Sequence, residues 1–213
     1  MKLVFIDVDG TLLKTRRSET LFAIELLNCG AIGKLQIAAY FKFYLKWFAS
    51  FGFTIAKKNK AYLFGLEKNL VARLADQYVQ KRLKYYVRLD LYERIQAHHR
   101  SGHQIVLLTG TLDCIARPLA ERLGIFFVKA SQCAMKNGYF TADPPLCHPY
   151  GLEKLRIAKE ISIRFNTRLS DSIVYADSRA DLPLLMAVSH PVAVAPDSKI
   201  ARIARQKGWE VLR

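Results

Sequence analysis

The chain has 213 residues, a length that suits one domain or one domain with a modest insertion. Hydrophobic residues make up 51% of it and charged residues 24%, a globular balance that excludes a disordered or collagen-like protein. Lysine and arginine number 33 against 18 aspartate and glutamate, so the formal charge is +15. This charge favours anionic partners: phosphorylated metabolites, anionic lipid or nucleic acid.

The cysteines and the apolar runs indicate the cellular compartment in which we expect the protein. The four cysteines are far apart and form no CxxC pair, which is typical of reduced thiols in a cytoplasmic protein. Acidic residues follow the N-terminus too early for a signal peptide, and no run approaches the ~18 apolar residues of a spanning helix. We therefore expect a cytoplasmic protein, and peripheral contact with the inner face of a membrane stays open.

Short apolar runs that end at turns predict the strands of a buried parallel sheet. In chain order these runs are residues 3–6, 105–108, 125–128, 173–176 and 191–194. Helical patterns separate them, at 91–101, 112–123, 152–165 and 182–188. Asn137-Gly138, inside residues 132–141, predicts a β-hairpin. The alternation of strand and helix predicts an α/β fold with a doubly wound, mostly parallel sheet.

Residues 14–90 interrupt this alternation with a helical pattern that is clearest at 35–48 and 70–88. The segment holds 15 lysine and arginine residues against 5 aspartate and glutamate, so it carries most of the net charge. We predict that it is a helical cap, inserted after the first strand into a core built from residues 1–13 and 91–213.

Polar residues stand where three of the predicted strands end: Asp7, Thr109 and Asp177. In a doubly wound sheet, ligands bind beyond the carboxyl ends of the strands, so we expect these side chains to converge. Asp7 and Asp9 lie close enough to repel each other unless a cation intervenes, and Mg²⁺ prefers such oxygen ligands and shares them with phosphates. Asp7 could then attack phosphorus, while Asp9 protonates the leaving group and later activates water.

Further candidate residues complete this chemistry. Asp177 and Asp181 flank the start of a predicted helix and could hold the cation. Thr109 and Gly110 suit a phosphoryl oxygen. An ammonium group at Lys154 would stabilise the charge on the transferred group.

In order and spacing these residues resemble the haloacid dehalogenase-like phosphohydrolases, specifically the subfamily that includes phosphoserine phosphatase. That family's pattern of DxDGT, Ser/Thr, Lys and DSxxD is matched by Asp7 to Thr11, Thr109, Lys154 and Asp177 to Asp181. The resemblance implies a Rossmann-like core, the subfamily's type of cap, and Mg²⁺ as cofactor. It also implies that Asp7, the Asp9 carbonyl oxygen and Asp177 are metal ligands, and that Asp181 supports them.

Two details of the pattern bear on the substrate. A second aspartate, Asp9, favours a phosphatase over the family's dehalogenases and transport ATPases. Phosphoserine phosphatases carry a glutamate shortly after the first motif, and the matching place here is about Arg16-Arg17, with Glu19 nearby. Cations at this place argue for a substrate with extra negative charge.

An aromatic and basic stretch at residues 40–60 leaves alternatives open. Its aromatic side chains could pack the cap and line the pocket, meet anionic lipid, or stack on single-stranded nucleic acid. We expect packing, and we regard nucleic acid as the weakest of the three.

These features lead to a Mg²⁺-dependent phosphomonoesterase for a small phosphorylated metabolite. One alternative is a phosphatase of lysophosphatidate or phosphatidylglycerophosphate at a membrane surface, with an apolar channel lined by residues 40–53. Another is a catalytically silent, basic module that binds nucleic acid or membrane. The oligomeric state is left open.

Overall fold

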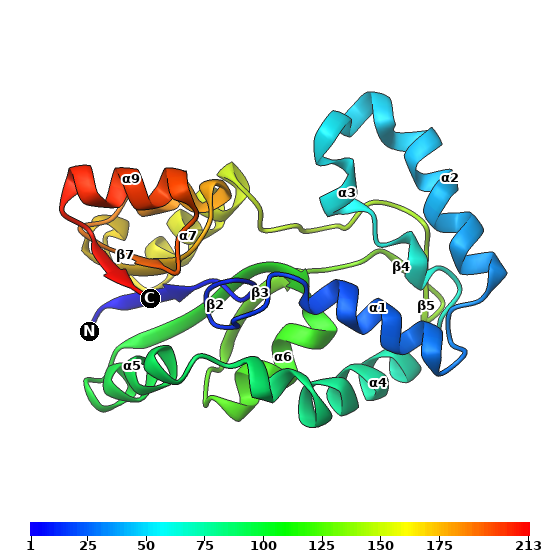
Figure 1. The fold of residues 1–213 in the computed structure, drawn as a ribbon, viewed down its shortest axis with the longest axis horizontal. Coiled ribbons are helices and arrows are strands. Elements are labelled where there is room, and N and C mark those ends of the chain that lie inside the picture. Colours follow the sequence, from blue (N-terminus) through cyan, green and yellow to red (C-terminus); the bar gives the residue numbers. More distant parts are fainter.

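The computed structural model describes all 213 residues and contains one six-stranded sheet in which every strand is parallel (Figure 1). The strand order is β3-β2-β1-β6-β7-β8. The strands are β1 (Leu3–Ile6), β2 (Gln104–Leu112), β3 (Phe127–Ser131), β6 (Ile173–Ala176), β7 (His190–Val194) and β8 (Glu210–Leu212). The order reverses between β1 and β6, which places a crevice at their carboxyl ends. The predicted doubly wound fold is confirmed.

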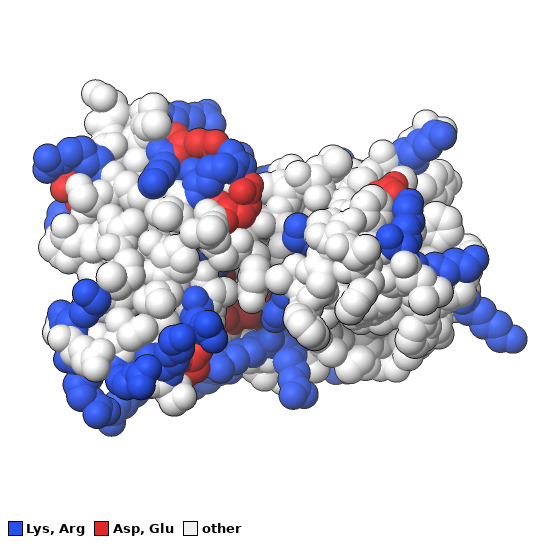
Figure 2. Space-filling view, turned by 90° about the horizontal axis from the view of Figure 1, so that it is seen from above, with Lys and Arg blue, Asp and Glu red and all other residues white.

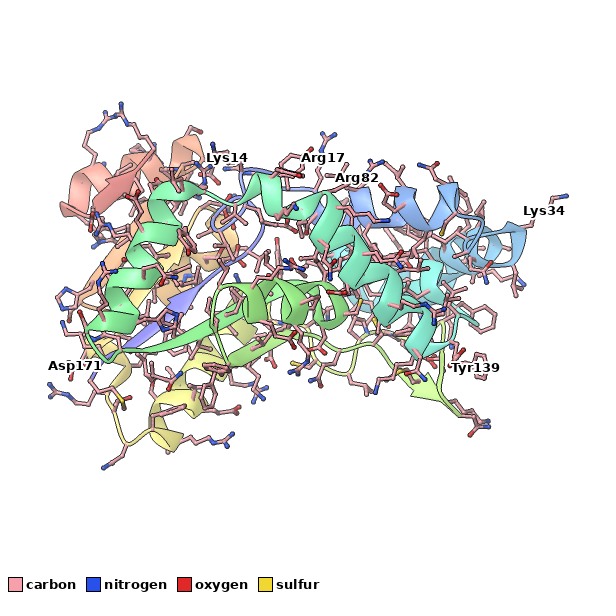
Figure 3. All side chains as sticks on the ribbon, turned by 90° about the horizontal axis from the view of Figure 1, so that it is seen from below. Lys14, Arg17, Lys34, Arg82, Tyr139 and Asp171 are labelled. Atoms are coloured by element: carbon pink, nitrogen blue, oxygen red, sulfur yellow. The ribbon has the colours of Figure 1, made fainter.

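Helices cover both faces of the sheet, which explains why β1 reads as an unbroken apolar run. Leu3 and Phe5 point to one face, where α7 (Leu152–Arg164), α8 (Leu182–Leu185) and α9 (Ser198–Lys207) pack. Val4 and Ile6 point to the other face, where α5 (Leu89–Arg100) and α6 (Asp113–Arg122) pack. Figure 3, seen from below, shows helices across this second face, with Asp171 at one end of the molecule and Lys34 at the other.

The segment that follows β1 is helical and divides between two clusters. It forms α1 (Ser18–Asn28), α2 (Lys34–Phe51), α3 (Ile55–Lys58) and α4 (Lys68–Lys81), with short 3₁₀ turns between them. Side chains of α1 and α4 belong to the main hydrophobic cluster, together with residues of α6. Side chains of α2 and α3 form a smaller cluster of their own. The division of the chain into a core and a cap at 14–90 stays a prediction.

A short hairpin pairs β4 (Met135–Lys136) with β5 (Tyr139–Phe140), within the segment that predicts one. It contacts the helical segment, because the Gly65 amide donates to the Phe140 carbonyl oxygen at 2.9 Å. In Figure 1 the hairpin lies beside α2 and α3, at the end of the molecule away from the two termini.

Several element boundaries differ from the sequence-based prediction. The helix predicted at 70–88 ends at Lys81, because the following residues form a 3₁₀ turn that hydrogen-bonds to the loop after β1. Strand β2 continues past Thr109 to Leu112, with irregular pairing to β3 after Leu108. The edge strand β8 and helix α9 were not predicted. None of the helices combines the length and the apolar composition needed to cross a bilayer.

Candidate active site

The carboxyl ends of β1, β2 and β6 open into a cavity of about 550 Å³. All seven candidate residues line it: Asp7, Asp9, Thr109, Gly110, Lys154, Asp177 and Asp181. Figure 2 shows a hollow between two lobes, with acidic residues deep inside and basic residues around its margin. The fold thus brings together residues that are more than 170 positions apart in the sequence.

A buried lysine links two of the aspartates. The Lys154 Nζ atom lies 2.7 Å from Asp7 Oδ1 and 2.6 Å from Asp181 Oδ1, and only 5% of its side chain is exposed. Burial disfavours the ammonium form, but the two carboxylates outweigh it and hold the pKa of Lys154 above its ordinary value. Burial raises the pKa of Asp7 to about 7, although Lys154 opposes the shift. Lys154 is therefore a fixed positive charge beside the carboxyl group that ends β1.

Three carboxylates converge beside this lysine. Asp7, Asp177 and Asp181 each offer an oxygen atom, and these atoms lie within 4.8 Å of one another. Burial raises the pKa of Asp177 to about 6, although the Arg16 guanidinium, 2.9 Å away, opposes the shift. A divalent cation among these oxygen atoms would keep the carboxylates ionised. Because hard oxygen ligands are what Mg²⁺ requires, the donor set fits this ion.

The turn after β1 depends on a glycine. Gly10 has a φ of +83°, and a Cβ atom placed there would lie 2.3 Å from Asp177 Oδ2. Since any side chain would collide with this carboxylate, glycine is needed both for the backbone conformation and for the close approach of the turn to Asp177. This requirement gives a physical reason for the Asp-Gly-Thr sequence at residues 9–11.

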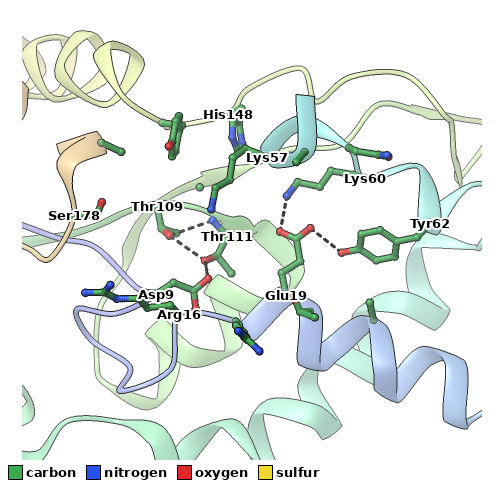
Figure 4. A pocket seen from close by; sticks show the side chains of 18 of the residues that line it. Asp9, Arg16, Glu19, Lys57, Lys60, Tyr62, Thr109, Thr111, His148 and Ser178 are labelled. Atoms are coloured by element: carbon green, nitrogen blue, oxygen red, sulfur yellow. Dashed lines mark hydrogen bonds and ion pairs between the residues drawn. The ribbon is translucent and has the colours of Figure 1, made fainter. Parts of the chain in front are cut away.

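Asp9 lies on the opposite side of the turn, at the start of α1. Its carboxylate accepts hydrogen bonds from the Ser18 amide at 3.1 Å and from the Thr111 hydroxyl at 3.2 Å. Thr109 Oγ1 lies 3.1 Å from Thr111 Oγ1, so the hydroxyl groups form a short chain to Asp9 (Figure 4). Burial raises the pKa of Asp9, although these hydrogen bonds oppose the shift. Asp9 therefore keeps its proton to a higher pH than an exposed aspartate.

The structure adds cavity residues that the sequence did not single out. The Ser178 hydroxyl donates to Asp181 at 2.8 Å, and Thr111 links Thr109 to Asp9. Ser178 is the serine of the DSxxD pattern, whereas Thr111 had no signal in the sequence beyond its place two residues after Thr109. Lys60 and Tyr62 also line the cavity. For the stretch at residues 40–60 we expected aromatic side chains, and not a lysine, to line the pocket.

A largely buried ion pair of Glu19 and Lys60 also lines the cavity. Glu19 accepts from Lys60 Nζ at 2.5 Å and from the Tyr62 hydroxyl at 3.0 Å (Figure 4). The family resemblance places Arg16-Arg17 where phosphoserine phosphatases carry a glutamate, and both arginines line the cavity together with Glu19. Arg16 binds Asp177, and its other hydrogen bond goes to the Ala195 carbonyl oxygen at 3.2 Å.

The lipid-phosphatase alternative predicts an apolar channel lined by residues 40–53, and the structure shows that this choice of lining residues was wrong. Of residues 40–53, only Tyr40 lines the cavity. The other apolar lining comes from α1, the loop after it, the start of α2, and two single residues: Ala23, Ile24, Leu27, Ile32, Ile37, Ala56 and Ala180. Most aromatic side chains of α2 instead pack on one another or face outward.

Comparisons with known proteins agree with this geometry. A family model described as haloacid dehalogenase-like hydrolase matches residues 4–186. The chain is 26% identical over 220 residues to a histidinol-phosphatase of Neisseria meningitidis, covering 99% of this chain and 97% of that protein. It is 31% identical over 119 residues to phosphoserine phosphatase SerB1 of Mycobacterium tuberculosis, covering 56% and 39%. The chain spans about half or less of the length of several curated relatives, 52% for a putative hydrolase of Mycobacterium leprae.

Solved structures share the fold. A Bordetella pertussis protein of unknown function superposes with a TM-score of 0.82 at 21% identity, covering 100% of this chain and 97% of that one. A phosphoserine phosphatase that carries an analogue of a phospho-aspartyl intermediate superposes with a TM-score of 0.64 at 18% identity, covering 99% and 92%.

Proposed function

The chain belongs to the family of haloacid dehalogenase-like hydrolases, and from this premise we propose that it is a Mg²⁺-dependent phosphatase of small phosphate monoesters. The observation that carries the proposal is the contact of Asp7 with Lys154, beside Asp177 and Asp181, at the end of β1. Relatives named phosphoserine phosphatase and histidinol-phosphatase support the reaction class. A full set of catalytic groups in one cavity argues against a silent binding module.

In the proposed reaction, an Asp7 oxygen forms a bond to phosphorus and the bond from phosphorus to the ester oxygen breaks. Asp9 donates its proton to the departing oxygen, so an alcohol leaves and Asp7 carries the phosphoryl group. Asp9, now ionised, takes a proton from water. The water oxygen then attacks phosphorus, which releases inorganic phosphate and restores the Asp7 carboxylate.

The other residues of the site would position the phosphoryl group and balance its negative charge. The Thr109 hydroxyl and the Gly110 amide bind phosphoryl oxygens, and Lys154 balances the charge on the transferred group and on Asp7. Asp7, the Asp9 carbonyl oxygen, Asp177 and Asp181 would hold Mg²⁺, which supplies positive charge between the two anions when bound. We further infer that residues 14–90 act as a cap over the cavity, and that the protein works in the cytoplasm.

The test is phosphate release from p-nitrophenyl phosphate in the presence of Mg²⁺. We expect Asp7→Asn to lower the rate by at least about 10³-fold, because the amide is not a nucleophile toward phosphorus. Asp171→Asn is the matched control. This residue, whose side chain is 47% exposed, precedes β6 at the end of the molecule opposite Lys34 (Figure 3), whereas the cavity lies beyond the carboxyl end of β6. Equal rates for wild type and Asp7→Asn would refute the mechanism.

A further inference from the structure

Away from Asp7, the side chains that line the cavity become largely apolar. Its far wall is formed by α1, the loop after α1 and the start of α2, and we call this part the apolar arm: Ala23, Ile24, Leu27, Ile32, Ile37 and Tyr40. A cavity of this volume accommodates a phosphate head group together with part of an apolar substituent. The apolar arm would therefore contact the alcohol part of the phosphate ester.

No free carboxylate is available there to bind a substrate ammonium. Outside the catalytic aspartates, Glu19 is the only acidic residue that lines the cavity. Both of its carboxylate oxygens already have partners, Lys60 and Tyr62, and the Lys60 side chain is only 6% exposed. Because breaking a buried ion pair is costly, Glu19 stays bound to its own lysine. This arrangement disfavours an amino-acid head group and leaves the arm to an uncharged chain.

The arm continues into an exposed apolar surface on α2. Ile37, Phe41, Leu45 and Phe48 follow one another at helical spacing, and they are 44%, 63%, 87% and 57% exposed. Ile37 belongs both to this stripe and to the cavity lining. Figure 2 shows the lobe with α2 as a broad uncharged surface with lysine and arginine along its margin. An exposed apolar patch of this kind marks an interaction site.

The charged side chains of α2 and of the segments next to it in the chain are all positive. Between Glu25 and Glu67 the chain has six lysines and no aspartate, glutamate or arginine. Lys34 and Lys42 are exposed on α2 itself. Lys46 also lies on α2, and it has a single partner, Asp143, at 3.5 Å. A helix with an apolar face bordered by lysines complements an anionic lipid surface, where lysines meet head groups and apolar side chains enter the acyl boundary.

We propose that the substrate is an amphiphilic phosphate monoester taken from an anionic lipid surface, with α2 lying on that surface and the substrate's apolar chain in the arm. The inference rests on the proposed phosphatase function and narrows its substrate class. The phosphate would reach Asp7 while the chain stays among apolar side chains, so extraction would not expose the chain to water.

The experiment compares two substrates. One is 1-oleoyl-glycerol 3-phosphate in vesicles of phosphatidylglycerol and phosphatidylcholine, and the other is soluble p-nitrophenyl phosphate. We expect the protein to sediment with these vesicles at low salt and to bind less at high salt, because the lysines are screened. The double variant Phe41→Ser/Leu45→Ser should lower both the bound fraction and the ratio of vesicle to soluble rates by at least about tenfold.

The matched control is Phe126→Ser/Ile163→Ser, which removes two apolar side chains of similar exposure, 85% and 79%, outside this surface. We expect it to leave the bound fraction and the ratio within about twofold of wild type, since neither side chain belongs to the proposed contact. Sedimentation that is absent at low salt would overturn the proposal, and so would equal losses in the two double variants.

The outcomes separate this inference from the proposed function. Asp7-dependent release from the soluble ester, with an unchanged ratio in the α2 variant, would refute the lipid surface alone. Binding to single-stranded DNA without binding to vesicles would likewise overturn it, by assigning α2 to nucleic acid. Failure to hydrolyse either ester would refute the phosphatase, whereas sedimentation would still report on α2.

Discussion

Lys154 shows how a single residue organises the site. It lies in the first turn of α7, yet its ammonium group reaches both the end of β1 and the segment after β6. Without it, three buried carboxylates would face one another with only Arg16 to compensate them. The ammonium therefore has a structural role as well as the proposed catalytic one.

Replacing this lysine should reveal both roles. We expect Lys154→Met to cost about 3 kcal/mol or more of unfolding free energy at pH 8 without Mg²⁺, because it leaves buried carboxylates unpaired. The loss should be smaller at pH 5, where the carboxyl groups take up protons. Urea unfolding measures it, and Lys159→Met, an exposed position on the same helix, is the control. Equal stability of both variants at pH 8 would contradict this account.

Some site residues could be predicted from the ends of strands, and others, such as Asp9, Lys154 and Asp181, from the order and spacing of the motifs. Asp7 and Asp177 each directly follow a short apolar run, so their convergence followed from the sheet alone. Lys60 could not be placed in this way, because it lies 41 residues after Glu19 and sits in a segment without strand ends. Its role depends on how the helices after β1 fold back, and a charge pattern does not specify that path.

At the scale of elements, the turn between β1 and α1 is the most constrained. Gly10 and Gly138 have nearly the same φ, +83° and +84°, but only at Gly10 would a Cβ atom meet other atoms. Both alanine substitutions should therefore cost similar backbone strain, about 1–2 kcal/mol. Gly10→Ala should in addition displace Asp177.

Calorimetric titration of Mg²⁺ distinguishes these effects. We expect Gly10→Ala to weaken Mg²⁺ binding by at least about tenfold, since a displaced ligand costs on the order of 10–100-fold in affinity. Gly138→Ala should bind the ion as the wild type does, because nothing lies within 4 Å of that position. Unchanged affinity in both variants would remove Asp177 from the metal site.

The helices and strands that could be predicted from the sequence have a clear hydrophobic pattern. The strands buried on both faces carry continuous apolar runs, and the long helices show a clear period. The edge strand β8 has only three residues, largely exposed, so it left no such signal. The helix predicted through Arg88 fails for another reason. Contacts of residues 86–88 with the loop after β1 override the local helical pattern.

At the scale of the whole molecule, protonation of a half-buried histidine, His98, should work against the fold in acid. Burial lowers the pKa of His98 to about 4, from an ordinary value of 6.5, and its ring bonds to the Tyr175 hydroxyl at 2.8 Å. Between these two values the unfolded chain binds more protons than the folded one. The contribution of His98 to stability therefore rises with pH across this window and is lost as the pH falls toward 4, whereas the raised pKa values of Asp7 and Asp177 act in the opposite direction when Mg²⁺ is absent.

Urea unfolding at saturating Mg²⁺ tests this dependence. Between pH 6.5 and 4.5 we expect wild type to lose on the order of 1–2 kcal/mol more than His98→Gln, a range that allows for partial exposure of the ring. His190→Gln is the control, since this exposed histidine hydrogen-bonds to the Lys2 side chain and not to Tyr175. Parallel pH curves for wild type and His98→Gln would contradict the assignment.

The central claim is that Asp7 carries the phosphoryl group, and the Asp9→Asn variant tests it most directly. Without the carboxylate that activates water, the phosphoenzyme should form from p-nitrophenyl phosphate and then accumulate, because its hydrolysis slows by about 10²–10⁴-fold. Acid quenching, borohydride reduction and peptide mass spectrometry should then find homoserine at position 7. A phosphoryl group on another residue, or an unmodified Asp7 while product is released, would contradict the account.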